Sequence, residues 1–273
     1  MLSKKHNKPQ RSNISGSKVA FNLGINDYRG TQNDLRGCVN DASAWQKLYS
    51  QYGYTTTFLK DSEVVQSEVR SIFRELEKLS NKYGENFKGA LTFSGHGTHT
   101  ADKNKDESDG RDEAWVLWDG LLVDDHIRRF IDSMHPSASL TIISDSCHSG
   151  TMTRSVLGLF SEEGYVKPRY LPPEDELEAA MEVTTRNQLL SPKGRQNEVL
   201  LTGCNASQYS YDAYLGGKYM GAMTYNATNI LKAKGNISFE KLYHLLRKEL
   251  PSNIHPQSPQ LEGKRKNKEK LFF

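Results

Sequence analysis

Cysteine is scarce in this chain, and long hydrophobic runs are missing from it. The 273 residues include three cysteines, and so low and odd a count argues against a disulfide framework and favours a reducing compartment. No apolar run approaches the roughly 20 residues that a membrane helix needs. The basic start lacks the apolar core of a secretion signal. We therefore expect a cytoplasmic protein that does not enter a membrane.

Excess charge of either sign is also missing. The formal net charge is +3, which is too small to indicate nucleic acid as a partner. A phosphate-binding loop of the form G-x-x-x-x-G-K-[ST] is absent, and no dinucleotide fingerprint follows the first expected strand. These absences argue against the alternative of a nucleotide-binding domain.

The chain does contain an alternation of strand and helix patterns. Apolar, β-branched runs predict strands at 18–26, 55–60, 89–97, 141–143 and 197–204. Apolar residues at helical spacing predict helices over 41–53, 64–84, 124–134, 220–235 and 238–250. The strands show little polar alternation, so they should be buried on both faces. This order predicts an α/β fold with a mostly parallel central sheet and helices on both faces.

Three polar stretches fall outside this pattern. Residues 100–113 are predicted to form a loop. The segment from about 151 to 196 has no clear period and is long enough to be functional. Residues 1–17 are expected to be a disordered arm, and residues 264–273 a basic tail whose aromatic end is docked.

Two strand ends carry residues that suit nucleophilic catalysis. His96 lies between Gly95 and Gly97, and Cys147 follows a buried strand. In parallel sheets reactive groups gather beyond the carboxyl ends of the strands. The thiolate is the reactive form of cysteine, and an imidazole can take the thiol proton and later protonate a leaving amine. The backbone N–H groups of Gly97 and Cys147 are candidates for stabilising an oxyanion.

Plainer interpretations exist for each of these residues. A lone buried cysteine is usually an inert small hydrophobe, and a lone histidine is usually a satisfied polar residue. His148 is a rival base, but neighbouring residues at a strand end point to opposite sides. Cys204 also ends an expected strand, yet no His–Gly element accompanies it, so we expect it in the core.

Six stretches, in order along the chain, resemble the metacaspases, which are caspase-like cysteine peptidases. They are GINDYRGTQNDLRGCVNDA (24–42), FSGHGT (93–98), DGRDE (109–113), VDDHI (123–127), DSCHSG (145–150) and HPQSPQLEG (255–263). The similarity spans about residues 18 to 263. His96 and Cys147 lie 51 residues apart (147 minus 96), close to the roughly 50 residues that separate the two in caspases.

The resemblance implies a caspase-like fold and a peptidase domain over 18–263. It implies a large segment (about 18–165), a linker (about 151–196) and a small segment (about 197–263). It also implies a zymogen that is cut autocatalytically in the linker. The linker's basic residues are the candidate cleavage sites: Arg154, Lys167, Arg169, Arg186, Lys193 and Arg195.

The resemblance further implies cleavage after Arg or Lys, with Cys147 and His96 as the catalytic pair. Asp41 and Asp145, together with Cys38 and Ser94, match the family's acidic substrate pocket. An arginine side chain can pair with a carboxylate through two hydrogen bonds, so we expect Arg to be cut at least as well as Lys. The alternatives are a helix N-cap for Asp41 and a structural hydrogen-bond acceptor for Asp145.

Calcium is the cofactor that the resemblance implies, as an activator rather than as part of the chemistry. Asp112, Asp124 and Asp125 match the family's ligands, but Arg154 stands where a further ligand is expected. A cation there opposes Ca²⁺, which prefers six to eight oxygen ligands. The two aspartates at 124 and 125 also suit a helix N-terminus.

The sequence therefore predicts a monomeric cysteine endopeptidase that acts on proteins or peptides with basic residues. The alternative is a catalytically silent caspase-like scaffold or adaptor. The presence of both His96 and Cys147 favours the enzyme.

Overall fold

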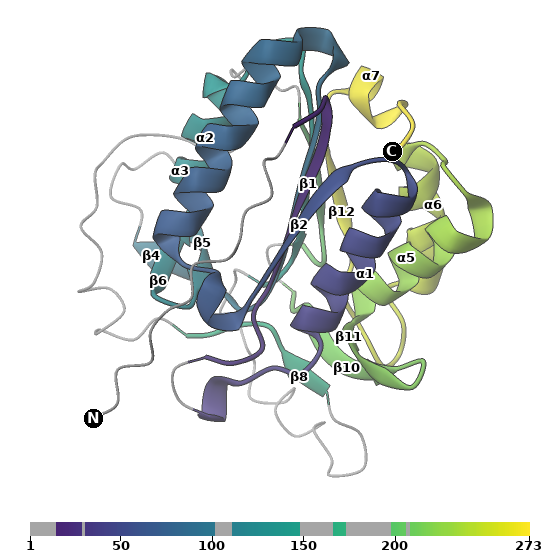
Figure 1. Ribbon diagram of the computed structural model, residues 1–273. Coiled ribbons are helices and arrows are strands. Elements are labelled where there is room, and N and C mark those ends of the chain that lie inside the picture. Colours follow the sequence, from purple (N-terminus) through teal and green to yellow (C-terminus); the bar gives the residue numbers. More distant parts are fainter. Residues whose placement is uncertain (1–14, 29–30, 102–110, 148–165, 173–197, 206–207) are drawn as a thin grey trace.

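The computed structural model describes residues 15–28, 31–101, 111–147, 166–172, 198–205 and 208–273. Its centre is a six-stranded sheet in the order β12-β9-β7-β3-β1-β2 (Figure 1). Neighbouring strands are parallel except β12 and β9, which confirms the mostly parallel sheet. The six strands are β1 (Lys18–Gly24), β2 (Thr55–Lys60), β3 (Lys88–Ser94), β7 (Ser139–Asp145), β9 (Glu198–Thr202) and β12 (Gln260–Gly263).

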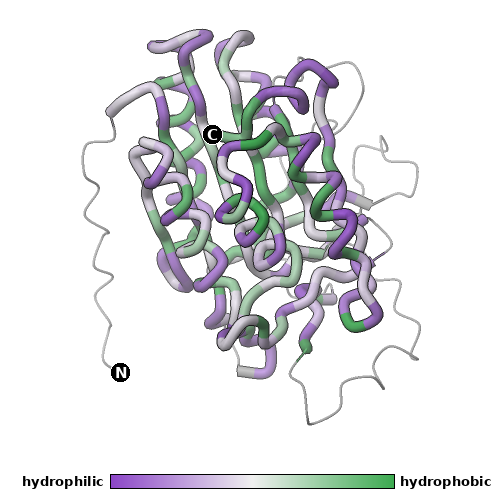
Figure 2. The backbone as a smooth tube through the Cα atoms, turned by 90° about the vertical axis from the view of Figure 1, so that its right-hand side faces the viewer, coloured by the Kyte–Doolittle hydropathy of each residue, from purple (hydrophilic) through white to green (hydrophobic). Residues whose placement is uncertain are grey.

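Helices cover both faces of this sheet, as predicted. On one face lie α1 (Cys38–Gln51), α5 (Ala222–Lys234) and α6 (Phe239–Glu249). On the other face lie α2 (Gln66–Tyr83) and α3 (Asp124–Ser133) (Figure 1). Each face has its own hydrophobic core, because successive residues of a strand point to opposite sides. Figure 2 shows the hydrophobic stretches concentrated in the interior strands.

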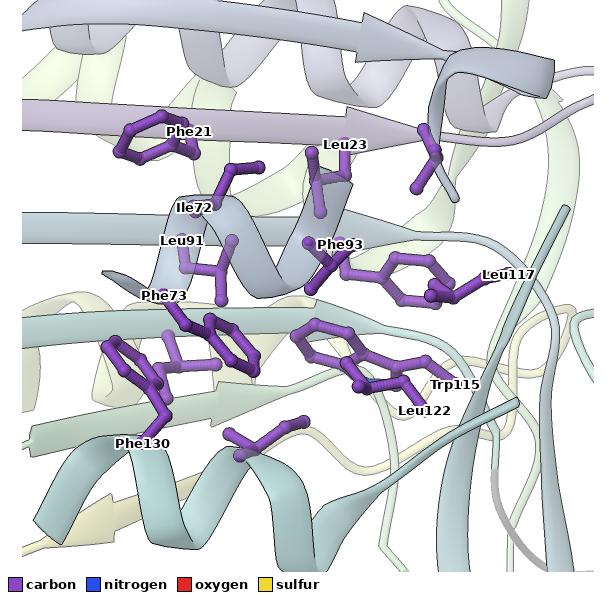
Figure 3. Packing of buried hydrophobic residues seen from close by; sticks show 14 of the residues in the cluster. Phe21, Leu23, Ile72, Phe73, Leu91, Phe93, Trp115, Leu117, Leu122 and Phe130 are labelled. Carbon is purple, nitrogen blue, oxygen red and sulfur yellow. The ribbon is translucent and has the colours of Figure 1, made fainter. Parts of the chain in front are cut away.

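The core beneath α2 shows why its residues form a helix. Val69, Ile72 and Leu76 recur at helical spacing and are buried against the sheet. Figure 3 shows side chains from β1 and β3 meeting those of α2 and α3, and the rings of Phe73 and Phe130 stack with centroids 4.3 Å apart. This packing fixes the strand ends from which the site residues extend.

Two small antiparallel sheets flank the main one at its carboxyl edge. The first contains β4 (Gly97–Ala101), β5 (Arg111–Leu117) and β6 (Gly120–Val123). The second contains β8 (Val166–Pro168), β10 (Tyr211–Leu215) and β11 (Lys218–Gly221). The expected loop over 100–113 was wrong at both ends, because β4 continues to Ala101 and β5 begins at Arg111.

The end of the chain packs against α1. A short helix, α7 (Arg265–Lys268), precedes Phe272 and Phe273, which are both buried. The Phe272 ring stacks on Trp45, and the Phe273 ring stacks on Tyr52 with centroids 4.0 Å apart. The docked aromatic end is thus confirmed, whereas residues 1–14 of the expected arm lie outside the described residues. Among the described helices, none combines the length and apolar character that crossing a bilayer demands.

Candidate active site

The sheet places His96 and Cys147 at the same edge. Strands β3 and β7 are parallel neighbours, and Ser94 pairs with Asp145 at their ends. His96 and Cys147 each follow two residues later, so they leave adjacent strands at equivalent positions. Both side chains are buried.

One carbonyl group fixes the tautomer of His96. Its Nε2 lies 2.7 Å from the carbonyl oxygen of Asn33, at the end of η1 (Thr31–Asn33). A carbonyl oxygen only accepts hydrogen bonds, so Nε2 carries the proton and Nδ1 keeps its lone pair. Nδ1 is buried and has no hydrogen-bond partner among the described residues. The imidazole therefore keeps a buried, unprotonated nitrogen whose lone pair no described group engages.

The surroundings of His96 keep it neutral. Burial, together with the nearby charges of Lys167 and Arg169, lowers the pKa of His96 to about 3, against the opposing effect of the Asn33 carbonyl. The His96 backbone N–H donates to the Tyr28 hydroxyl at 2.7 Å, and the two rings lie 4.8 Å apart. A neutral, oriented imidazole is the form that can accept a proton.

The Cys147 thiol lies against the Ser210 peptide group. Its Sγ is 3.2 Å from the Ser210 carbonyl oxygen and accepts the Ser210 N–H. Cys204 is buried beside it, and a hydrogen bond to the Cys147 side chain raises the pKa of the Cys204 thiol. Among the residues that the structure describes, the Cys147 thiol and the His96 imidazole are not hydrogen-bonded to each other.

The two expected oxyanion donors converge on one oxygen. The backbone N–H of Gly97 donates to the carbonyl oxygen of Arg169 at 3.0 Å, and that of Cys147 donates to the same oxygen at 3.1 Å. Two N–H groups aimed at one point can stabilise negative charge that develops there.

The Arg169 side chain fills an acidic pocket. Its guanidinium is fully buried and lies 2.7 Å from Asp41, 2.9 Å from Asp212 and 3.5 Å from Asp145. It also donates to the Asp145 carbonyl oxygen at 3.1 Å. The structure therefore brings together the two aspartates that the sequence indicated and adds Asp212.

Backbone and hydroxyl donors hold these carboxylates in place. Asp145 accepts hydrogen bonds from Ser210 Oγ and from the N–H and hydroxyl of Thr224. It is thus a structural acceptor and a pocket residue at once. Asp212 accepts the N–H groups of Arg36 and Gly37 at the start of α1.

Asp41 is not the helix N-cap that the alternative interpretation expected. Helix α1 begins at Cys38 with Gly37 as its N-cap, so Asp41 lies in the first turn. Its carboxylate accepts the Gly221 N–H. Burial raises the pKa of Asp41 to about 7, partly offset by Arg169 and reinforced by Asp145 and Asp212.

Cys38 and Ser94 lie at the margin of this pocket. The Cys38 thiol is buried, and burial raises its pKa, with Arg169 opposing and the three aspartates adding to the effect. Ser94 ends β3 directly opposite Asp145.

Sequence reasoning missed several contributors to the site. Asp212 and Ser210 come from the start of β10 and the residues before it, Asn33 acts through its backbone, and Tyr28 acts through its hydroxyl. Tyr28 and Asn33 lie within the family-like stretch 24–42, but nothing in it marks their roles, and no local pattern marks Asp212 or Ser210. Arg169 was one of six linker candidates, and nothing in the sequence distinguished it. His148 and Arg154 lie outside the described residues.

The acidic residues matched to calcium ligands do not form a metal site within the described ranges. Burial, together with the nearby charges of Glu113, Asp112 and Asp125, raises the pKa of Asp124 to about 9, against the opposing effect of the Asp125 backbone N–H. Asp124 Oδ1 accepts the Asp125 N–H at 2.9 Å, as at a helix start. In the same ranges, no three His, Cys, Asp or Glu side chains are grouped so that they hold a metal ion.

Sequence comparison finds metacaspases among the curated relatives of this chain. Curated relatives include metacaspase-1 of Ajellomyces capsulatus, 29% identical over 92% of this chain and 81% of that protein. Metacaspase-1 of Saccharomyces cerevisiae is 30% identical over 93% of this chain and 68% of its own length.

Solved structures show the same fold. Protein GSU0716 of Geobacter sulfurreducens superposes with a TM-score of 0.73 at 21% identity, covering 94% of this chain and 98% of that one. Caspase-1 of Spodoptera frugiperda gives a TM-score of 0.57 at 10% identity, covering 92% and 88%. The caspase-domain family of C14 peptidases matches residues 17–270. The chain therefore belongs to the caspase-domain family, with metacaspases among its relatives.

Proposed function

We propose that this chain is a cysteine endopeptidase that cuts peptide bonds after Arg or Lys, with Cys147 as nucleophile and His96 as general base and acid. One observation carries the proposal. An arginine side chain lies buried among Asp41, Asp145 and Asp212 while its carbonyl oxygen accepts the N–H groups of Gly97 and Cys147. This is how the residue before a scissile bond would bind.

The chemistry follows from the positions of these groups. His96 takes the thiol proton, and the Cys147 sulfur attacks the carbonyl carbon of the bound basic residue. The N–H groups of Gly97 and Cys147 stabilise the oxyanion. His96 then protonates the leaving amine, and water releases the acyl-enzyme. The Asn33 carbonyl orients the imidazole throughout.

The acidic pocket explains the expected preference. Three buried carboxylates attract a cation, and the planar guanidinium group of an arginine can contact more than one of them at once. A substrate with Asp in this place would bring a further negative charge against Asp41, Asp145 and Asp212, which costs several kcal/mol.

Fluorogenic peptides test the proposal. Purified chain is incubated with otherwise identical peptides ending in Arg, Lys or Asp before the fluorophore, beside Cys147→Ala. We expect cleavage of the Arg and Lys peptides by the wild type alone. Equal rates for wild type and Cys147→Ala, or no cleavage of any peptide by either one with or without added calcium, would instead indicate the catalytically silent scaffold.

Calcium as an activator stays a prediction, and the arrangement of Asp112, Asp124 and Asp125 gives it no support. The same assay with added calcium or with chelator tests it. A cytoplasmic location and a monomeric state also stay predictions, for which fractionation of cells and light scattering are the measurements.

A further inference from the structure

The segment around Arg169 runs through the active site on both sides of that residue. Before Arg169, β8 pairs antiparallel with β10, so that Lys167 lies opposite Asp212 (Figure 1). The Arg169 N–H donates to the Ser210 carbonyl oxygen at 2.9 Å. After Arg169, the Leu171 N–H donates to the Gly97 carbonyl oxygen at 2.9 Å. Extended peptides bind by adding a strand in this manner.

The backbone contacts distinguish this arrangement from a structural ion pair. Pairing with three carboxylates requires only the guanidinium. It does not require the Arg169 carbonyl to occupy both N–H donors, those of Gly97 and Cys147, at the same time. The side chain and the carbonyl are therefore both placed as in a bound substrate.

The other described basic residue of the linker is bound elsewhere. Lys167 Nζ donates to the carbonyl oxygens of Gln32 and Asp34, each at 2.8 Å. Tyr170, on the far side of Arg169, has its hydroxyl 3.2 Å from His99 Nδ1. Within the described part of the linker, Arg169 alone enters the acidic pocket.

We infer that residues 166–171 are the chain's own substrate and that the bond between Arg169 and Tyr170 is the bond that the enzyme cuts in itself. The inference rests on the proposed function. Cys147 sulfur bonds to the Arg169 carbonyl carbon as the bond to the Tyr170 nitrogen breaks, and the new Tyr170 amine takes the proton held by His96. Water then hydrolyses the thioester, which frees the thiol and leaves Arg169 as a carboxylate. Until the segment departs, it blocks the site.

N-terminal analysis of the full chain tests this inference. Wild type, Cys147→Ala, Arg169→Gln and Arg186→Gln are incubated after purification, and their fragments are identified by mass. We expect a fragment that begins at Tyr170 in the wild type and in Arg186→Gln, the matched change in the same linker. We expect none in Cys147→Ala or Arg169→Gln.

A peptide assay removes any dependence on the folding of a variant. The peptide YVKPRYLPPE, which is residues 165–174, is offered to the processed enzyme beside a copy with Gln at the Arg position. We expect a single cut after Arg, and cleavage of the Gln peptide slower by about 100-fold, because the carboxylates lose their cationic partner.

The outcomes separate the inference from the proposed function. A chain that cuts fluorogenic Arg peptides but forms no Tyr170 terminus overturns the inference and leaves the peptidase in place. A Tyr170 terminus that also forms in Cys147→Ala overturns it as well, because another protease then makes the cut. A chain that cuts neither itself nor any peptide overturns both.

Discussion

The His96 imidazole depends on two oxygen atoms from distant parts of the chain. The Asn33 carbonyl sets which ring nitrogen holds the proton, and the Tyr28 hydroxyl accepts the His96 backbone N–H. Tyr28 is therefore a positioning residue, and it acts on the base through the backbone.

Tyr28→Phe is expected to lower both stability and kcat. Removing the hydroxyl leaves the buried His96 N–H unpaired, which costs about 1–3 kcal/mol of unfolding free energy. Thermal melting and peptide kinetics measure the two effects, and kcat should fall more than KM rises. Tyr49→Phe is the matched control, because the buried Tyr49 hydroxyl has no partner among the described residues. Equal losses in the two variants would contradict the positioning role.

The charge state of Asp41 should govern substrate binding near neutral pH. Burial holds the pKa of Asp41 at about 7 with Arg169 present, and Arg169 is the largest influence that lowers it. Below this pKa the carboxyl is neutral, and above it the carboxylate attracts a guanidinium. Without Arg169 in the pocket this pKa should lie higher, so for the self-cut enzyme we expect KM for an Arg peptide to fall as pH rises above about 7. Asp41→Asn should flatten that KM profile while the kcat profile is retained.

At the scale of elements, β10 both completes the pocket and pairs with the bound segment. Asp212 on β10 supplies the third carboxylate, and Lys167 of β8 lies opposite it in the antiparallel ladder. The start of this strand therefore carries part of the specificity, although it is far from Cys147 in sequence.

Asp212→Asn should lower kcat/KM for an Arg peptide by about 10- to 100-fold, because one of two close charge partners is lost. The fall should be smaller for a Lys peptide, whose ammonium makes fewer directed contacts. Glu75→Gln, the same chemical change in a surface pair with Lys78, is the control and should leave kcat/KM unchanged. An Asp212→Asn enzyme that kept the full Arg rate would exclude this residue from the pocket.

Sequence patterns predicted the elements whose periodicity is strong. The spacing of apolar residues predicted α2 and α3, and the β-branched runs predicted β1, β3 and β7. The hairpin of β5 and β6 was missed, although Asp119-Gly120 between apolar runs is a turn signal. Helix α1 begins three residues earlier than expected, since Asn26 Oδ1 accepts the N–H groups of Cys38 and Val39.

Site residues could be predicted from the sequence only where they follow a strand end or belong to a family motif. His96 and Cys147 end neighbouring strands, which periodicity and glycine placement indicate. Asp212 and Arg169 join Asp41 across more than a hundred residues of chain, and no spacing rule reports such a contact. A backbone acceptor such as Asn33 has no residue signature, because every residue has a carbonyl.

At the scale of the molecule, the central sheet contains strands from both sides of the inferred cleavage site. Strand β9, which follows the linker, is parallel to β7 on one side and pairs with β12 on the other. A buried ion pair joins Arg128 of α3 to Glu198 of β9 at 2.7 Å. The segments before and after Arg169 therefore share one core.

The two fragments of the self-cut chain should therefore remain associated with each other. We expect both fragments to co-elute in gel filtration at the volume of intact Cys147→Ala, and to separate only in denaturant. Arg128→Met should weaken this association, since it leaves the Glu198 carboxylate buried without its cation, at a cost of about 3–5 kcal/mol. Fragments that separated in plain buffer would contradict the prediction.

Because the Arg169 carbonyl oxygen already accepts both oxyanion donors, a peptide or inhibitor added to the uncut chain meets a filled site. Arg169 is covalently tethered to the pocket that it fills, so its effective concentration there is on the order of millimolar or higher. Any added peptide or inhibitor must therefore displace Arg169 from the pocket before it can bind. Dissociation constants measured on the uncut chain would therefore report the exchange of one ligand for another, and would underestimate the intrinsic affinity of the pocket.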